Sequence, residues 1–258
     1  MYRASMFLFL CFSLMLCVQD ANARNKKKPL LKQCGSAFAL QEASDIKLNT
    51  TTLSFSHAWK PGWRTSGLQL GLGVRCHASF GERSMIYKSA PAALVNGIRG
   101  IPSLFYMRIA ENMDTLRVNG TQLETINAFG FVRYAFNTKW SVELNLDLAG
   151  FTMGATKNAT LYYGENNEAS RDASAAPASR NICLLGNNNH GTLQTQLVVM
   201  RKWKERWTWQ AGLACQATEY IFSKPVLYTN SLGNVVQTDR YRNREVLITL
   251  GARYELKK

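Results

Sequence analysis

The clearest feature of this chain is a strict alternation of apolar and polar residues along several segments. In residues 140–148 the two sets separate completely, Trp140, Val142, Leu144, Leu146 and Leu148 against Ser141, Glu143, Asn145 and Asp147. Successive side chains of a β-strand point to opposite faces, so this pattern predicts a strand with one apolar and one polar face. Such a strand fits a soluble sandwich around a core, and equally a membrane barrel whose apolar face meets lipid.

Alternating segments recur along the chain, and their length favours the membrane. They are 48–59, 67–80, 101–110, 122–136, 139–153, 191–202, 207–222 and 244–256. Strands of globular proteins usually have about five or six residues, whereas strands that cross a bilayer at a tilt need about 9 to 11. We therefore predict an all-β fold, a small up-and-down antiparallel transmembrane β-barrel of eight strands, with ten strands as an open alternative.

The connections between these segments divide into short turns and long loops. Tight turns are expected at 137–138 and 203–206, and long loops near 81–100, 154–190 and 223–243. Short turns on one rim and long loops on the other are typical of bacterial outer-membrane barrels. The barrel would then occupy residues 48–258, preceded at 24–47 by a basic tail or a first strand. The 154–190 loop, rich in Asn, Ala and Ser, is expected to be flexible.

Tryptophans flank these two turns and a third short turn at 60–66, and they predict an interfacial aromatic girdle. They are Trp59, Trp63, Trp140, Trp203, Trp207 and Trp209. Trp is enriched where a membrane meets water, so a shared rim is favoured. If the tryptophans share one rim, the missing strand lies within residues 34–47. Residues 101–110 then belong to an outer loop. Because girdles form at both interfaces, a registration with 101–110 in the barrel stays open.

The N-terminus carries an export signal. Arg3 precedes an apolar run from Met6 to Val18, and small and polar residues follow as far as Ala23. This arrangement predicts a secretory signal peptide at 1–23, cleaved near Ala23, because the run is too short to span a bilayer as a helix. The expected location is the outer membrane of a Gram-negative cell envelope.

The positive charge of the chain limits the classes of binding partner that can be expected. The formal net charge is +14, and removal of residues 1–23 leaves it unchanged because Arg3 and Asp20 cancel. An exported protein rarely meets nucleic acid, so no nucleic-acid partner is predicted. The expected partners are outer-membrane lipids and lipopolysaccharide, together with the barrel assembly machinery, while the sequence identifies no external ligand.

Cysteine and histidine positions predict no cofactor and no metal site. Four cysteines follow the signal peptide, Cys34, Cys76, Cys183 and Cys215, without a CxxC motif or a Cys/His cluster. Four cysteines permit three disulfide pairings, among which the sequence cannot choose. Cys76 and Cys215 lie in phase with apolar residues, so free thiols are expected there.

Charged residues on the polar faces form a predicted lumen network, composed of Arg75, Arg108, Arg133, Glu143, Asp147, Arg253 and Glu255. The lumen of an eight-stranded barrel is just wide enough for side chains, so these charges are expected to pair and fill it. Unpaired, each would cost several kcal/mol. A selectivity filter or a proton path is the alternative. Gly71 and Gly73 on the same face are expected to relieve crowding.

His77 and Ser79 lie two residues apart on one polar face, and this resembles the His-x-Ser arrangement of outer-membrane lipid A deacylases. A carboxylate would complete a nucleophile, base and orienter set. Glu82 lies too close along the chain for that role. We therefore expect two lumen-lining side chains, predict no catalytic residue, and keep a lipid A deacylase as an alternative.

The stretch from Phe129 to Ala155 resembles a hairpin of outer-membrane β-barrel proteins of the Bacteroidota, within the small porin-like or OmpA-like barrels. The matching residues are Asn137, Lys139 and Trp140 in the turn, Asn145 and Asp147 in the strand, and the closing Gly150, Phe151 and Gly154. The resemblance implies a barrel and carries no catalytic residue. Many outer-membrane strands end the chain on an aromatic, whereas this one ends with Tyr254 to Lys258. A weaker insertion signal or a different insertase preference is therefore expected.

These patterns together favour a non-enzymatic outer-membrane barrel with a filled polar lumen, acting in envelope integrity or surface binding through its long loops. A narrow porin-like channel for small solutes and a lipid A deacylase are the alternatives. A secreted β-sandwich is a further alternative, and it would dissolve without detergent.

Overall fold

The computed structural model describes residues 31–61, 67–81, 84–89, 112–164, 169–184, 189–229 and 235–256. These residues form thirteen strands: β1 (Leu31–Ser44), β2 (Leu48–Pro61), β3 (Leu68–Gly81), β4 (Ser84–Ser89), β5 (Thr115–Asn119), β6 (Gln122–Ala135), β7 (Trp140–Gly154), β8 (Lys157–Tyr163), β9 (Ala169–Pro177), β10 (Arg180–Ile182), β11 (Leu193–Lys202), β12 (Trp207–Thr229) and β13 (Val235–Glu255). None of the described residues form a helix with the length and apolarity needed to span a bilayer.

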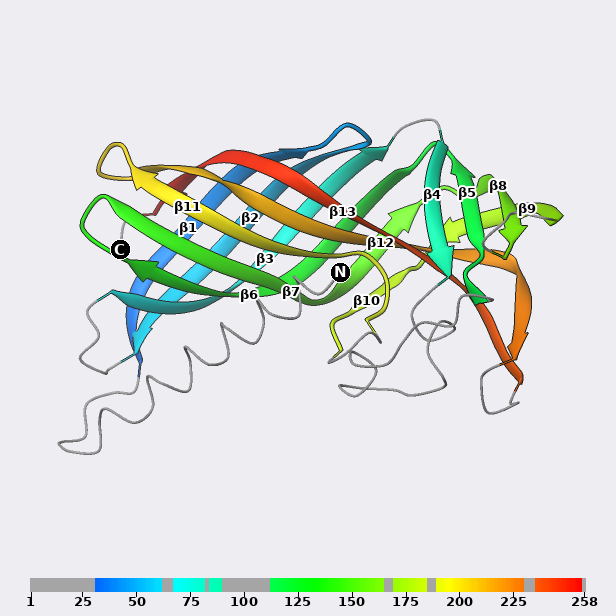
Figure 1. Ribbon diagram of the computed structural model, residues 1–258. Helices are drawn as coiled ribbons and strands as arrows, with labels where there is room; N and C mark the ends of the chain where they lie inside the picture. The colour runs from blue at the N-terminus through cyan, green and yellow to red at the C-terminus, as the bar shows by residue number, and fades with distance from the viewer. Residues whose placement is uncertain are drawn as a thin grey trace.

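Eight of these strands close an antiparallel ring, visible on the left and centre of Figure 1. The ring runs β1, β2, β3, β6, β7, β11, β12, β13 and returns to β1. A closed ring pairs each strand on both sides, which removes the exposed edges of an open sheet. The prediction of an all-β, antiparallel, up-and-down sheet is confirmed. The prediction of eight or ten strands is wrong for the sheet as a whole, because the described residues form thirteen strands in it.

Four further strands build a second, smaller circuit at one end of the ring. β4, β5, β8 and β9 pair in that order, β4 joins β13 at Tyr241, and β9 joins β12 at Tyr220. Since β12 and β13 also pair with each other beyond these points, the circuit is closed. We call this unit the cap, comprising β4, β5, β8, β9, residues 220–229 and residues 235–242; it lies on the right of Figure 1.

The cap corrects the prediction of three long loops. The segment 81–100 contains β4, the segment 154–190 contains β8, β9 and β10, and the segment 223–243 contains the ends of β12 and β13. β9 reads ASRDASAAP, a composition with low strand propensity. It becomes a strand because β8 and β12 supply its partners, which the local sequence does not reveal.

The N-terminal registration also follows from the structure. Leu31–Ser44 forms β1, so part of the segment predicted as a tail or first strand belongs to the ring. Its alternation is interrupted by a register shift between Gln33 and Gly35, where Gly35 has a φ of 131° that favours glycine. The segment 101–110 and the signal peptide at 1–23 lie outside the described residues.

The ring has an apolar outer face and a polar inner face, which is the distribution of a membrane barrel and the reverse of that of a soluble sandwich. Large apolar side chains are exposed on the outer face of the ring strands, among them Phe38, Leu53, Phe55, Leu72, Val74, Ile126, Leu146, Val199, Leu213, Val246, Ile248 and Leu250. Polar side chains are buried on the inner face, among them Thr50, Thr52, Arg75, His77, Asn127, Glu143, Asn145, Asp147, Gln194, Gln196, Gln210, Gln216 and Arg253.

An apolar core occurs at the cap end. This core contains Tyr87, Leu116, Leu161 and Phe222 of the cap. It also contains residues of the ring strands at the end next to the cap, such as Leu123; we call that end the upper end of the ring. These side chains are almost completely shielded from solvent. The Tyr87 ring also lies 4.9 Å from that of Tyr220, within the usual range for aromatic pairs. The mouth of the ring is therefore covered by a packed hydrophobic layer.

The cap core predicts a local effect of mutation. Leu161→Ala should destabilise the cap by about 2–5 kcal/mol, because it leaves a cavity in a fully buried apolar site. Limited proteolysis of the folded protein should then cut within 155–192 faster than in the wild type, while the ring stays folded. Ile86→Ala, on the exposed face of the same unit, is the matched control. Equal cleavage of the two variants would contradict the assignment of this core.

Candidate functional site

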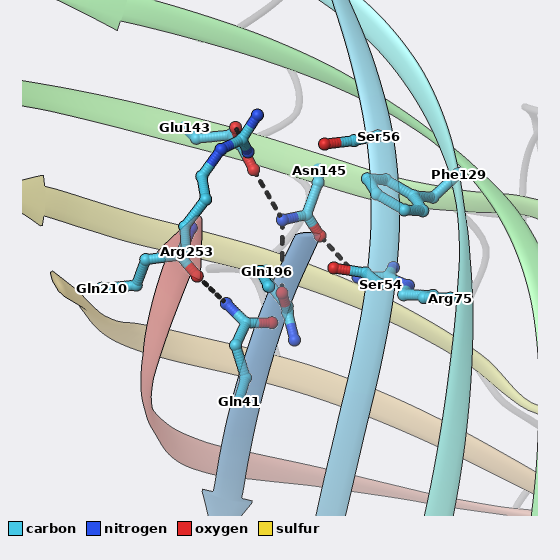
Figure 2. Close-up of a pocket in the computed structure, with 11 residues that line it drawn as sticks. Gln41, Ser54, Ser56, Arg75, Phe129, Glu143, Asn145, Gln196, Gln210 and Arg253 are labelled. Atoms are coloured by element: carbon cyan, nitrogen blue, oxygen red, sulfur yellow. Dashed lines mark hydrogen bonds and ion pairs between the residues drawn. The ribbon is translucent and has the colours of Figure 1, made fainter. Parts of the chain in front are cut away.

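The interior of the ring holds a network of charged and amide side chains below the cap core. Figure 2 shows its central part, where Gln41, Arg75, Glu143, Asn145 and Arg253 come from four strands, β1, β3, β7 and β13, and line one small space. The inward positions of the strands carry these polar residues in phase, so ring closure brings them together.

Asp147 on β7 is the centre of one half of the network. Its Oδ1 accepts a hydrogen bond from Arg75 Nε at 2.5 Å. Its Oδ2 accepts hydrogen bonds from Asn127 Nδ2 at 2.8 Å and from the backbone N–H of Gln194 at 2.7 Å. The carboxylate is completely buried, so these donors supply the interactions that water would otherwise provide.

Arg75 uses its whole guanidinium group. Besides the bond to Asp147, Nη1 donates to Asn145 Oδ1 at 2.7 Å and Nη2 donates to the carbonyl of Gln194 at 2.6 Å. The group also stacks over the Phe129 ring at 4.9 Å, a cation–π distance. Arg75 thereby bridges β3, β7 and β11 across the lumen.

Glu143 is the centre of the other half. Arg133 donates to Glu143 Oε2 from Nε at 3.0 Å and from Nη2 at 2.6 Å. Arg253 Nη1 lies 3.5 Å from the same oxygen. Asn145 Nδ2 donates to Glu143 Oε1 at 3.4 Å, and since Asn145 also accepts from Arg75, this amide connects the two halves.

Five of the seven predicted network residues meet in this interior: Arg75, Arg133, Glu143, Asp147 and Arg253. Arg108 lies outside the described residues. Glu255 is half-buried near the end of β13, and its backbone N–H donates to the carbonyl of Arg206.

Buried amides were missed at the sequence level, although a signal existed. Gln194 and Gln196 sit in phase on one face of β11, and Gln196 Nε2 donates to Gln194 Oε1 at 2.8 Å. Gln41 Nε2 donates to Gln210 Oε1 at 3.0 Å across the ring. Glutamines at alternate positions of a predicted strand indicate a polar face as clearly as charges do.

Little free space remains in the network. One cavity between its side chains, lined by Gln41, Arg75 and Glu143 among others, measures about 10 Å³, room for about one water molecule. Gly71 and Gly73 contribute to this packing, because a Cβ at either position would clash with Phe131 or Phe129 respectively. The interior described here is a packed polar core, as expected for a ring of eight strands.

His77 and Ser79 do not form the pair that a deacylase-like site requires. His77 Nδ1 is hydrogen-bonded to Thr52 at 2.8 Å, while Ser79 Oγ is hydrogen-bonded to Thr50 at 3.0 Å and accepts from Gln216 at 3.0 Å. Both side chains are buried in the polar core. Among the described residues, no group of three His, Cys, Asp or Glu side chains is placed to hold a metal ion.

The residues quoted above for the hairpin at 129–155 have structural roles. Asn137 Oδ1 accepts from the backbone N–H groups of Lys139 and Trp140, both at 2.8 Å, which closes the turn. Asn145 and Asp147 belong to the polar core. Gly150 lies against the backbone of β6, where a Cβ would clash with Ile126 and Asn127.

The predicted girdle residues lie at the rim with the short turns. Trp140, Trp203, Trp207 and Trp209 are exposed there, and Trp59 is half-buried. Trp63 lies outside the described residues. Of the cysteines, Cys76, Cys183 and Cys215 are free in the described part of the chain.

A second charged cluster lies on the outward face of β12 and β13, near the cap. Glu219 pairs with Arg240 at 2.7 Å and with Arg242 at 2.6 Å, and both arginines also donate to the carbonyl of Asn189. Burial by itself would raise the pKa of Glu219, but the hydrogen bond from Arg240 and the charge of Arg242 hold that pKa below its ordinary value. The cluster thereby fastens residues 189–190 to the wall of the ring.

No family model and no curated protein matches the chain. Among solved structures, Neisserial surface protein A is 9% identical, with 88% of this chain and 96% of that chain covered and a TM-score of 0.32. A major outer membrane protein from Thermus thermophilus is 11% identical, with 86% and 100% covered and a TM-score of 0.26. The KdgM porin is 12% identical, with 86% and 99% covered and a TM-score of 0.23. Likenesses this remote support no conclusion about activity.

The interior network predicts a large loss of stability when its carboxylates are removed. Glu143→Leu combined with Asp147→Leu leaves Arg75, Arg133 and Arg253 buried without counter-charges, and breaking a buried pair typically costs about 3–5 kcal/mol. The temperature at which the folded gel band disappears should fall by more than about 10 °C. Glu42→Leu with Glu124→Leu, two exposed carboxylates on the outer face, is the matched control. Unchanged heat stability of the interior variant would refute the network.

The outer cluster predicts a pH effect on residues 189–192. Because the folded pKa of Glu219 is depressed, its stabilisation is present at neutral pH and is lost as the pH falls below about 4. Hydrogen exchange of the backbone amides in residues 189–192, corrected for intrinsic rates, should therefore become faster below about pH 4. The pKa of His190 in the same segment is lowered by burial and by the charge of Arg240. Glu219→Gln should remove the transition and Glu205→Gln, in an exposed turn, should not; a transition that survives Glu219→Gln would contradict the assignment.

Proposed function

We propose that this protein is a transmembrane β-barrel of a bacterial outer membrane, sealed by its own side chains and acting without catalysis at its outer end. The observation that carries the proposal is the inside-out distribution of polarity. Charges and amides are buried within the ring, while large apolar side chains cover its outside. In water this distribution would expose a broad hydrophobic surface, and in a bilayer the same surface is solvated by acyl chains.

The height of the apolar belt supports this environment. On the outward face of β13, Val246, Ile248 and Leu250 are each more than 60% exposed, and Arg244 and Tyr254 bound the row. Tyr254 lies ten positions after Arg244, which corresponds to about 33 Å of strand at ~3.3 Å per residue. A tilt of about 40° reduces this to about 25 Å, the height of the apolar band of outer-membrane barrels.

The orientation in the membrane follows from the two rims. The tryptophans surround the short turns, as expected of residues at a membrane interface. Bacterial barrels place short turns in the periplasm and long connections outside, so the cap would face the exterior. The Bacteroidota origin, the cleavage near Ala23 and insertion by the barrel assembly machinery belong to the same proposal and rest on the sequence motifs.

The closed interior supports a role in envelope integrity or surface binding rather than transport. The ion pairs fill the lumen, and the apolar core of the cap covers its outer mouth. A solute would have to displace both layers. The narrow-channel alternative requires a movement of the cap, and the deacylase alternative requires a rearrangement of His77 and Ser79, which bond to different partners.

The proposal predicts the behaviour of the full chain in a bacterial host. The protein should fractionate with the outer membrane and migrate differently on gels with and without boiling, because a closed sheet resists detergent at room temperature. In planar bilayers the unboiled protein should give no steady current, since its lumen is packed. A uniform conductance would support the channel instead. Release into plain buffer without detergent would contradict the membrane barrel altogether.

A further inference from the structure

A row of cations continues the apolar belt of β13 beyond the membrane-facing part. Arg240, Arg242 and Arg244 occupy alternate positions, so they share the outward face of Val246. On the neighbouring strand β4, Lys88 is exposed and lies directly opposite Arg242. Of these four cations, Lys88 and Arg244 are exposed, Arg240 is partly exposed, and Arg242 is buried beneath Asn189. We call this group on two paired strands the upper cation patch.

The position of this patch along β13 corresponds to one bilayer interface. The Tyr254 ring packs against the Trp207 ring in a tilted arrangement with centroids 5.0 Å apart, so the lower end of the belt lies at the tryptophan rim. About 25 Å of apolar surface separates that rim from Arg244. The patch therefore begins where the headgroups of the opposite leaflet lie. This step rests on the proposed membrane barrel.

The charge balance at the centre of the patch is positive. Glu219 is the carboxylate that binds Arg240 and Arg242, one negative charge against two positive ones. It holds these two guanidinium groups in place, and Arg242 Nη1, although buried, has no partner among the described residues. Below the patch, the carboxylate of Glu42 on β1 lies opposite Leu250 and accepts from Thr51.

We propose that the upper cation patch, through its exposed Lys88 and Arg244, binds the phosphate groups of a phosphorylated outer-leaflet lipid of the lipid A class. Guanidinium groups suit phosphate because their planar fork matches its oxygens. The apolar row directly beneath the cations accepts the acyl chains of the same molecule. Because the cations and the apolar row are continuous, a lipid can contact both. A soluble anion would contact the cations alone and would gain no binding energy from the apolar belt.

The test measures binding of bisphosphorylated lipid A to the detergent-folded full chain by native mass spectrometry. Lys88→Gln with Arg244→Gln should weaken binding about tenfold or more, the combined effect of two cations at an anionic surface. The matched control, Lys60→Gln with Lys202→Gln, removes two exposed cations from the opposite rim and should leave binding within about twofold. Lipid A without phosphates should bind the wild type as weakly as the patch variant does.

Three results would overturn the assignment. Equal losses in the two double variants would show a response to total charge. Equal binding of lipid A with and without phosphates would show that the belt alone holds the lipid. Competition by inorganic phosphate at the concentration of lipid A would show a soluble-anion site. Each sample is first checked for the gel shift of the folded barrel, so failure of that shift would count against the proposed membrane barrel and not against the patch.

Discussion

The buried carboxylate of Asp147 is the interaction on which the interior of this protein depends. A ring of eight strands has no room for bulk water, so each charge that points inward needs a partner from another strand. Asp147 takes donors from β3, β6 and β11. Together with β7, these strands are consecutive neighbours in the ring, so the ion pair between Arg75 and Asp147 forms only when β3, β6 and β7 have paired in the right register. The buried carboxylate of Asp147 needs these donors and a counter-charge, and it therefore favours the one arrangement of strands that supplies them.

The protein combines two interiors with opposite chemistry. Below, amides and ion pairs fill the ring, and Asn145 connects the Asp147 and Glu143 halves. Above, the cap packs aromatic and aliphatic side chains as a small soluble domain would. The boundary falls where β12 and β13 leave the ring and continue into the cap. This division agrees with a lower part surrounded by lipid and an upper part surrounded by water.

Much of the ring could be predicted from local patterns, and the cap could not. The alternation in β7 correctly assigns Leu144 outward and Asp147 inward. A register shift between β6 and β7 near Ala128 then changes the phase, so that Thr152 points inward, and nothing in the alternation announces this shift. The strands of the cap are short or rich in alanine and serine. Their conformation depends on partners that the chain reaches only after folding.

The sequence by itself determined which face of each long strand is apolar, where the short turns lie, and that charges point inward, because the period of two along a strand is a local property. Tertiary structure alone decided that Arg75 meets Asp147 while Arg133 meets Glu143, and that His77 and Ser79 bond to different partners. It also placed Lys88 beside Arg242. These contacts depend on strand order and register, which are set by closure of the ring and by the docking of the cap.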